Sequence, residues 1–231
     1  MRRFLLALAV CSAAPFSAMA ENTPVVVELF TSQGCSSCPP ADEMMHQLAE
    51  RDDVVALSLH VDYWDYIGWK DEFADPRHAK RQRAYAVHGA RRSVYTPEMI
   101  VNGESDIVGA RPLELSAAIE AHKAKPRKVA LTTKRDGSQL TIHAEPVVQI
   151  EGPVLVQLIR YQDERTANIT RGENAGRTIS YMNVAQDWQV LDVWDGQSEF
   201  ETQVALSDDL PAVVLLQSEA NGHILAAAHF R

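Results

Sequence analysis

The sequence has 231 residues, with 22 Lys or Arg and 31 Asp or Glu, so its formal net charge is −9 at pH 7. This acidic balance, without a run rich in Lys and Arg, excludes the basic surface by which proteins bind nucleic acid or anionic membranes. It favours small molecules or proteins as partners. The length suits one large domain or two small ones.

Residues 1–20 have the pattern of a secretory signal peptide. Arg2 and Arg3 precede an apolar stretch from Phe4 to Val10, and Ala18-Met19-Ala20 fits a cleavage site. The apolar stretch is shorter than the roughly 20 residues that cross a bilayer. We therefore expect export to the periplasm or out of the cell, with no membrane insertion once the signal is removed.

Strands and helices alternate in the first half of the remaining chain. Apolar, β-branched runs predict strands, and Pro39 and Asp75-Pro76 fit helix starts because Pro is tolerated in a first turn and Asp is a good N-cap. The predicted strands are 24–31, 54–61, 99–101 and 107–109, and the predicted helices are 39–49, 76–88 and 112–123. The order βαβαββα is that of a thioredoxin fold, so we expect an α/β domain over residues 21–125.

After residue 128, helical periodicity gives way to short alternating runs. The predicted strands are 129–135, 140–144, 154–162, 179–181, 188–194, 203–206, 212–217 and 224–230. Short strands at this spacing predict an all-β, sandwich-like domain over residues 126–231. The charged segment 123–127, which contains Pro126, is the expected linker between the two domains.

Cys35 and Cys38 are separated by two residues at a predicted junction between a strand and a helix. A thiolate at a helix N-terminus is stabilised by the helix dipole and free N–H groups, and cysteines in such motifs have pKa values of roughly 3.5 to 7.5 instead of about 8.5. We predict that Cys35 is an accessible nucleophile and Cys38 a buried resolving thiol. The alternative is a static disulfide, although closing so small a loop stabilises a fold little.

A second segment that fits dithiol chemistry is Thr96-Pro97, directly before the predicted strand 99–101. Together with GCSSCP at 34–39 and Asn102-Gly103, this segment resembles the thioredoxin superfamily. The resemblance implies a cis peptide bond between Thr96 and Pro97, opposite the dithiol. It also implies that these two residues bind the substrate backbone.

Over nearly the whole chain, the sequence is similar to a family of secreted thioredoxin-like proteins of unknown function. Besides the dithiol, the similarity lies in the segments 28–34, 61–65, 68–69, 95–97 and 171–178. The resemblance implies family membership and a candidate site, but it transfers no substrate. We expect the segment 171–178 to be a loop of the β-rich half that is hydrogen-bonded to neighbouring strands.

Glu28 is an acidic residue within an otherwise apolar predicted strand. Thioredoxins often carry a buried carboxylate near this position that relays protons to the inner cysteine, and burial would raise its pKa. The resemblance therefore suggests a catalytic role for Glu28. A carboxylate that caps or pairs at the strand edge is the alternative.

Four aromatic residues lie within the seven-residue segment 63–69. Trp64 and Trp69 are candidates for an apolar rim that docks a substrate protein beside the dithiol, since aromatic residues concentrate at interface hot spots. Alternatively, these rings pack over the second helix or against the β-rich half.

These features favour an exported thiol–disulfide oxidoreductase that acts on protein or small-molecule thiols and disulfides and needs no further cofactor. Two other functions stay open. One is a copper-binding protein in which Cys35 and Cys38 hold Cu(I), and the other is a non-catalytic binding module built on the same fold. The spacing of the eight histidines selects no metal ligand, so we predict no metal site.

Overall fold

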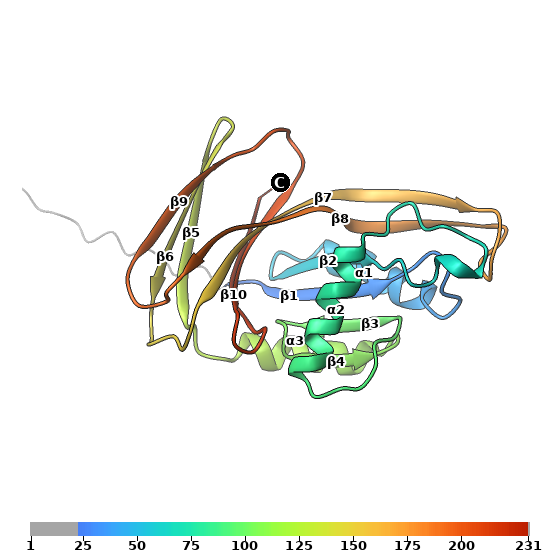
Figure 1. Ribbon diagram of the computed structural model, residues 1–231, viewed down its shortest axis with the longest axis horizontal. Coiled ribbons are helices and arrows are strands. Elements are labelled where there is room, and N and C mark those ends of the chain that lie inside the picture. The colour runs from blue at the N-terminus through green and yellow to red at the C-terminus, as the bar shows by residue number, and fades with distance from the viewer. Residues whose placement is uncertain (1–22, 231) are drawn as a thin grey trace, which may run out of the picture.

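The computed structural model describes residues 23–230, and Figure 1 shows their arrangement. The predicted signal peptide, residues 1–20, lies outside the described residues. Within residues 23–230, no helix has the length and apolar character needed to cross a membrane.

Eleven strands within the described residues form two sheets, so the expected α/β class is confirmed as a mixed α/β architecture. The larger sheet has eight strands in the order β11-β10-β7-β8-β2-β1-β3-β4, and the smaller has three in the order β5-β6-β9. The strands are β1 Val25–Thr31, β2 Val54–His60, β3 Glu98–Val101, β4 Ser105–Val108, β5 Val129–Asp136, β6 Gln139–Pro146, β7 Val154–Ile169, β8 Arg177–Trp194, β9 Phe200–Ala205, β10 Ala212–Ser218 and β11 Ile224–Phe230.

The helices begin as the sequence predicts. The three α-helices are α1 Pro39–Ala49, α2 Pro76–His88 and α3 Pro112–Lys123, and each has Pro in its first turn, where the missing N–H has no intrahelical partner to lose. The Asp75 side chain caps α2 by accepting a hydrogen bond from the Arg77 N–H. A short 3₁₀ helix, η1 Asp65–Ile67, interrupts the aromatic loop after β2.

Alternation along β1 decides which helix covers which face of the large sheet. Val25, Val27 and Leu29 pack with buried residues of α1 and α3 in one core cluster. Val26 and Phe30 point the other way and pack against α2. The helices therefore cover both faces of this half of the sheet.

The small sheet covers the other half of the large sheet, on the face opposite α2. Leu140 and Ile142 of β6 share a core cluster with Val214 of β10 and with inward-facing residues of β7. In Figure 1 this two-sheet part lies at one end of the molecule and the helices gather at the other end. The packing is sandwich-like, since two sheets bury one face against each other.

The C-terminal strands are divided between the two sheets: β5, β6 and β9 form the small sheet, and the other four join the large one. The expected all-β half instead contributes β7, β8, β10 and β11 to the same sheet as the N-terminal strands. The junction is narrow, because β8 pairs with β2 through Ser58 and Val184 alone. The expected boundary at 125/126 thus lies between α3 and β5, but the large sheet contains strands from both sides of it.

The β7–β8 hairpin is much longer than predicted. Its strands have 16 and 18 residues, whereas the sequence predicted a strand at 154–162 and separate strands at 179–181 and 188–194. Side chains fasten it to β2: the Ser58 hydroxyl donates to the Met182 carbonyl at 2.7 Å, and Asn183 Nδ2 donates to the Ala56 carbonyl at 2.9 Å. The hairpin runs along the sheet to the end at which β1 and β2 finish (Figure 1).

Candidate functional site

A Cys35–Cys38 disulfide lies between the end of β1 and the start of α1. Its Cα atoms are 5.4 Å apart. Cys38 is the N-cap of α1, and its carbonyl oxygen accepts hydrogen bonds from the N–H groups of Ala41 and Asp42 at 2.8 and 3.0 Å. The dithiol therefore occupies a helix N-terminus as predicted, with Cys38 rather than Cys35 at the cap itself.

The predicted substrate-binding segment lies against this loop. The Thr96–Pro97 peptide bond is cis, as the resemblance implied. The Ser37 hydroxyl lies 3.4 Å from Cys35 Sγ and 3.5 Å from the Thr96 carbonyl oxygen. Trp64 Nε1 donates to Thr96 Oγ1 at 2.7 Å. The fold thus brings together three segments that are distant in sequence.

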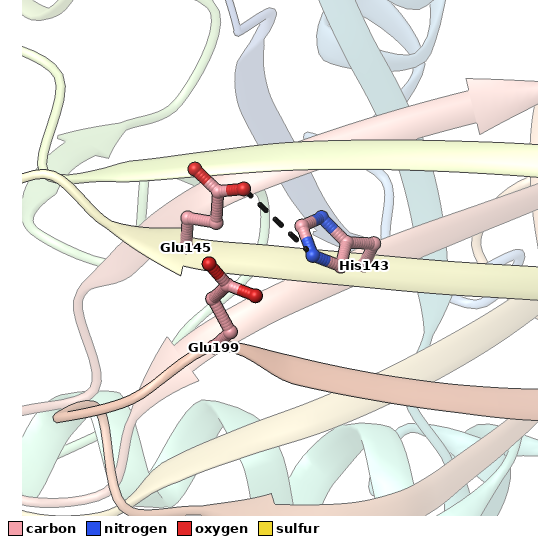
Figure 2. Close-up of side chains that lie close together, drawn as sticks. All are labelled: His143, Glu145 and Glu199. Carbon is pink, nitrogen blue, oxygen red and sulfur yellow. Dashed lines mark ion pairs between the residues drawn. The ribbon is translucent and has the colours of Figure 1, made fainter.

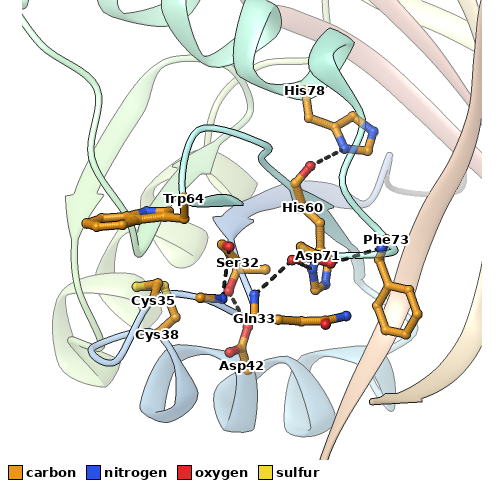
Figure 3. Close-up of polar contacts among 12 residues, drawn as sticks. Ser32, Gln33, Cys35, Cys38, Asp42, His60, Trp64, Asp71, Phe73 and His78 are labelled. Atoms are coloured by element: carbon orange, nitrogen blue, oxygen red, sulfur yellow. Dashed lines mark hydrogen bonds and ion pairs between the residues drawn. A yellow bond between two sulfur atoms is a disulfide. The ribbon is translucent and has the colours of Figure 1, made fainter. Parts of the chain in front are cut away.

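The disulfide is covered, which corrects the prediction of an accessible Cys35. Only 2% of Cys35 and none of Cys38 is exposed. Figure 3 shows the Trp64 ring lying over the two sulfur atoms. The sequence analysis placed Trp64 beside the dithiol but did not predict that the two cysteines would be buried. In this conformation little of Cys35 is open to an external thiol.

A buried carboxylate that sequence reasoning missed lies one turn along α1 from Cys38. Asp42 is 2% exposed, and Thr31 Oγ1 donates to its Oδ1 at 2.7 Å. Burial raises the pKa of Asp42 to about 7, and the Thr31 hydrogen bond opposes this rise. A signal was present in the sequence, because position 42 shares the inward face of α1 with Met45 and Ala49.

A second buried network fixes the loop on the other side of the disulfide. His60 Nδ1 lies 2.7 Å from Asp71 Oδ2, and that oxygen also accepts the Gln33 N–H at 2.8 Å. Burial alone would raise the pKa of Asp71, but the charge and hydrogen bond of His60 and the N–H groups of Gln33 and Phe73 hold it below its ordinary value. Asp71 therefore anchors the backbone two residues before Cys35 (Figure 3).

Two histidines of this region have structural partners. His78 Nδ1 donates to the His60 carbonyl oxygen at 2.9 Å, and burial lowers the pKa of His78 to about 4. The His60 ring is held edge-on between Phe73 and Tyr181, with ring centroids 5.3 and 4.6 Å away. Neither residue faces the sulfur atoms.

Trp69 is not part of a rim beside the dithiol. Its Nε1 donates to Gln33 Oε1 at 2.7 Å, and its ring packs against a cluster that contains Phe73, Ile169 and Tyr181. The alternative that these rings pack against the β-rich half is therefore the one that the structure supports for Trp69. Trp64 alone of the two lies beside the disulfide.

Glu28 is remote from α1, on the opposite face of the sheet. It follows the orientation of Val26 and Phe30, and its carboxylate accepts hydrogen bonds from Arg81 Nε at 2.6 Å and Tyr85 Oη at 2.5 Å. A proton relay from Glu28 to Cys38 is incompatible with this position. The alternative was a carboxylate that caps or pairs at the strand edge. Glu28 does pair, but it is buried on the interior strand β1 and its partners come from α2.

The loop 170–176 at the tip of the β7–β8 hairpin reaches the dithiol loop. Asn174 is 2% exposed, and its Nδ2 donates to the carbonyl oxygens of Gln33 and Cys35 at 2.9 Å each. We expected this loop to be hydrogen-bonded to neighbouring strands. Gly176 N does donate to the Ile169 carbonyl of the neighbouring strand β7 at 2.8 Å. The partners of Asn174, however, lie 139 and 141 positions earlier in the chain.

One cluster of possible metal ligands lies far from this site, on the solvent face of the small sheet. His143 and Glu145 of β6 and Glu199 before β9 place ligand atoms within 4.8 Å of one another (Figure 2). The side chains are half-buried or exposed, and His143 Nε2 lies 3.8 Å from Glu145 Oε1. Because such exposed acidic groups are common without a cation, we assign the cluster no function.

Comparison with known proteins gives a family but no activity. Protein AGR_C_4864 from Agrobacterium tumefaciens, whose crystal structure is solved, is 32% identical, with a TM-score of 0.78 over 91% of this chain and 95% of that one. HBP35 of Porphyromonas gingivalis is 15% identical, with a TM-score of 0.63 over 90% of this chain and 75% of that one, and so shares the fold alone. No curated protein matches. Residues 26–217 match the family described as "Protein of unknown function (DUF1223)", and the chain therefore belongs to the DUF1223 family.

Proposed function

We propose that this protein is an exported thiol–disulfide oxidoreductase whose first half is thioredoxin-like. The order β1-α1-β2-α2-β3-β4-α3 is consistent with that fold, and the four strands lie side by side as β2-β1-β3-β4. The proposed location, the periplasm or the exterior, agrees with the signal-like pattern of residues 1–20 and with a disulfide, which persists in oxidising compartments.

One observation carries the proposal: a two-residue-spaced disulfide at a helix N-terminus, opposite a cis-proline segment and one turn from a buried carboxylate. A static disulfide needs none of these companions. Hydrogen bonds at the N-terminus of α1 and the helix dipole stabilise a thiolate there. Asp42, with a pKa of about 7, can hold or release a proton near neutral pH.

The proposed reaction exchanges two electrons with two external thiols. A thiolate attacks Cys35 Sγ, a mixed disulfide forms, and the Cys35–Cys38 bond breaks with its electron pair leaving on Cys38. The Asp42 carboxyl gives its proton to the Cys38 thiolate. A second external thiolate then attacks the mixed disulfide, so that the products are an external disulfide and the reduced Cys35-Cys38 dithiol. Oxidation of a substrate dithiol by Cys35–Cys38 proceeds through the same steps.

The buried disulfide makes this a gated reaction. In the proposed open state the loop that carries Trp64 and the backbone of Cys35 have moved apart. Trp64 also stacks on Tyr66, with ring centroids 6.3 Å apart and planes 17° from parallel, and Tyr66 is 81% exposed. We propose that an apolar segment of a substrate protein binds this aromatic pair and so opens the cover.

The test is the equilibrium of the purified protein with glutathione, together with catalysis of insulin reduction by dithiothreitol. We expect a potential within the range of known oxidoreductases, about −270 to −120 mV, and insulin reduction faster than without the protein. Cys35→Ser should abolish catalysis, and Cys38→Ser should trap a mixed disulfide through Cys35. A disulfide that stays intact below about −300 mV, with no catalysis, would identify a structural bond and overturn the proposal.

A further inference from the structure

The tip of the β7–β8 hairpin holds the backbone of the dithiol loop through one buried amide. Asn174 Nδ2 carries two hydrogens, and the carbonyl oxygens of Gln33 and Cys35 accept them at equal distances of 2.9 Å. Asn174 Oδ1 accepts a hydrogen bond from Arg177 Nη1 at 3.1 Å. The orientation of the amide is thereby fixed, because a flipped amide would place its oxygen against two carbonyl oxygens.

The hairpin tip packs against the rest of the protein, and these contacts fix the position of Asn174. Gly172 has a φ of +76°, and a Cβ there would lie 3.2 Å from Trp69 Cβ, so the turn needs glycine for both its conformation and its close approach. Gly176 N donates to the Ile169 carbonyl at 2.8 Å. The fully buried Ile169 packs with Phe73 and Tyr181 directly below the tip.

This clamp acts on the residue whose sulfur must be attacked. The Cys35 carbonyl is bound to the hairpin, and the Cys35 side chain lies under Trp64. Exposure of Cys35 Sγ requires a shift of its backbone or of its cover, and a backbone shift breaks one or both bonds to Asn174. Without Asn174, the buried carbonyl groups of Gln33 and Cys35 would lose these donors, and a buried acceptor without a donor costs free energy.

We propose that Asn174 is a positioning residue that keeps Cys35 closed, so that the β7–β8 hairpin sets the rate at which the disulfide can be reduced. This inference rests on the proposed redox role of the disulfide. It assigns a function to the C-terminal half: the long hairpin controls a site that the N-terminal half carries. A partner that displaces the tip would activate the dithiol.

The experiment measures the rate of reduction by tris(2-carboxyethyl)phosphine, followed by thiol labelling and mass spectrometry. Asn174→Ala and Asn174→Asp both lack the amide donor, and each should be reduced about tenfold faster than the natural protein, the effect of losing two net hydrogen bonds. Asn168→Ala is the matched control, because Asn168 is exposed on the same hairpin and should leave the rate unchanged.

Denaturant dependence separates positioning from a general loss of stability. Reduction through a local opening should depend only weakly on urea in both Asn174 variants, whereas reduction through global unfolding follows the full urea dependence of stability. Reduction rates of the Asn174 variants equal to that of the natural protein would contradict the proposed role of Asn174. So would a faster rate with the full urea dependence of global unfolding. If the natural protein catalyses no exchange while both variants are still reduced faster, the proposed function fails and the clamp stands.

Discussion

Asp42 is a buried residue whose ionisation should affect stability. Burial raises its pKa from 3.8 to about 7. Well below pH 3.8 the carboxyl is protonated in both the folded and the unfolded state. As the pH rises, the unfolded chain ionises first, so this group progressively destabilises the folded protein until the full effect is reached above pH 7. The gap between the two pKa values corresponds to about 4 kcal/mol.

Asp42→Asn removes this dependence, because Asn does not titrate. We expect the free energy of unfolding of the variant, relative to the natural protein, to increase by up to about 4 kcal/mol between pH 4 and pH 8. Urea unfolding at pH 4, 6 and 8 measures it. Glu43→Gln is the control, because Glu43 is the exposed neighbour on the same helix. A flat difference for Asp42→Asn would show that Asp42 ionises normally.

Trp64 is the residue that shields the sulfur atoms. Trp64→Ala removes the ring over Cys35, its stacking on Tyr66 and its hydrogen bond to Thr96, so we expect reduction of the disulfide by a small phosphine to become about tenfold faster. Trp64→Phe keeps an aromatic cover without the hydrogen bond, so its rate of reduction should lie between those of the natural protein and Trp64→Ala. An unchanged rate in Trp64→Ala would place the barrier elsewhere in the loop.

The candidate site could be predicted from sequence only where its signals are local. The Cys35–Cys38 spacing, the prolines after it and Thr96-Pro97 sit beside strand and helix boundaries that periodicity already indicates. Asp42 carried a helical-face signal that was overlooked. Asn174 carried none, because its importance comes from a contact 139 positions away in the chain.

At the scale of elements, a buried ion pair joins α2 to β1. Arg81 on α2 donates to both oxygens of Glu28 on β1, and its Nη1 reaches Gln217 on β10 at 2.8 Å. Its guanidinium also lies over the Trp188 ring of β8, 4.1 Å from the centroid. One side chain thus connects four elements around a carboxylate that is 0% exposed.

Arg81→Ala should therefore lower the free energy of unfolding by about 3–5 kcal/mol, because Glu28 would stay buried without its cation. The double variant Arg81→Met, Glu28→Gln should lose less, since it leaves no unpaired charge. Arg77→Ala is the control on the same helix: its pair with Asp75 is half-exposed and should contribute at most about 1 kcal/mol. Equal losses for Arg81→Ala and Arg77→Ala would contradict a buried-pair effect.

The elements themselves were largely predictable, except for the hairpin. Proline at each helix start and apolar runs in the strands gave bounds within a few residues for α1, α2, α3 and most strands. The outer part of β7 is partly exposed and rich in polar residues, so it carries no apolar run that predicts a strand, and the outer part of β8 carries only the short run 179–181. The outer part of the hairpin forms because β7 and β8 pair with each other, and a local sequence pattern does not predict which segments pair.

At the scale of the whole molecule, the two halves of the chain share one core. Buried residues of α2 and β1 pack in the same cluster as Ile159 and Tyr161 of β7, Ala185 of β8 and Leu215 of β10. The sequence pattern did indicate that helices are confined to the first half of the chain and that strands follow after residue 128. It could not indicate that β8 would continue the sheet beside β2, because a single bridge and two side-chain hydrogen bonds form that junction.

A fragment that ends at residue 125 should therefore not fold as a stable domain. It lacks β8, so the edge of β2 is unpaired, and it loses the C-terminal side chains that bury Val26, Phe30 and Leu57. We expect non-cooperative urea unfolding and poorly dispersed amide signals, whereas the chain from residue 21 to 231 should unfold in one transition. Circular dichroism and NMR distinguish these outcomes. A dispersed spectrum and a sigmoidal transition for the fragment would establish an independent N-terminal domain, with the β-rich half as a removable cover of the dithiol.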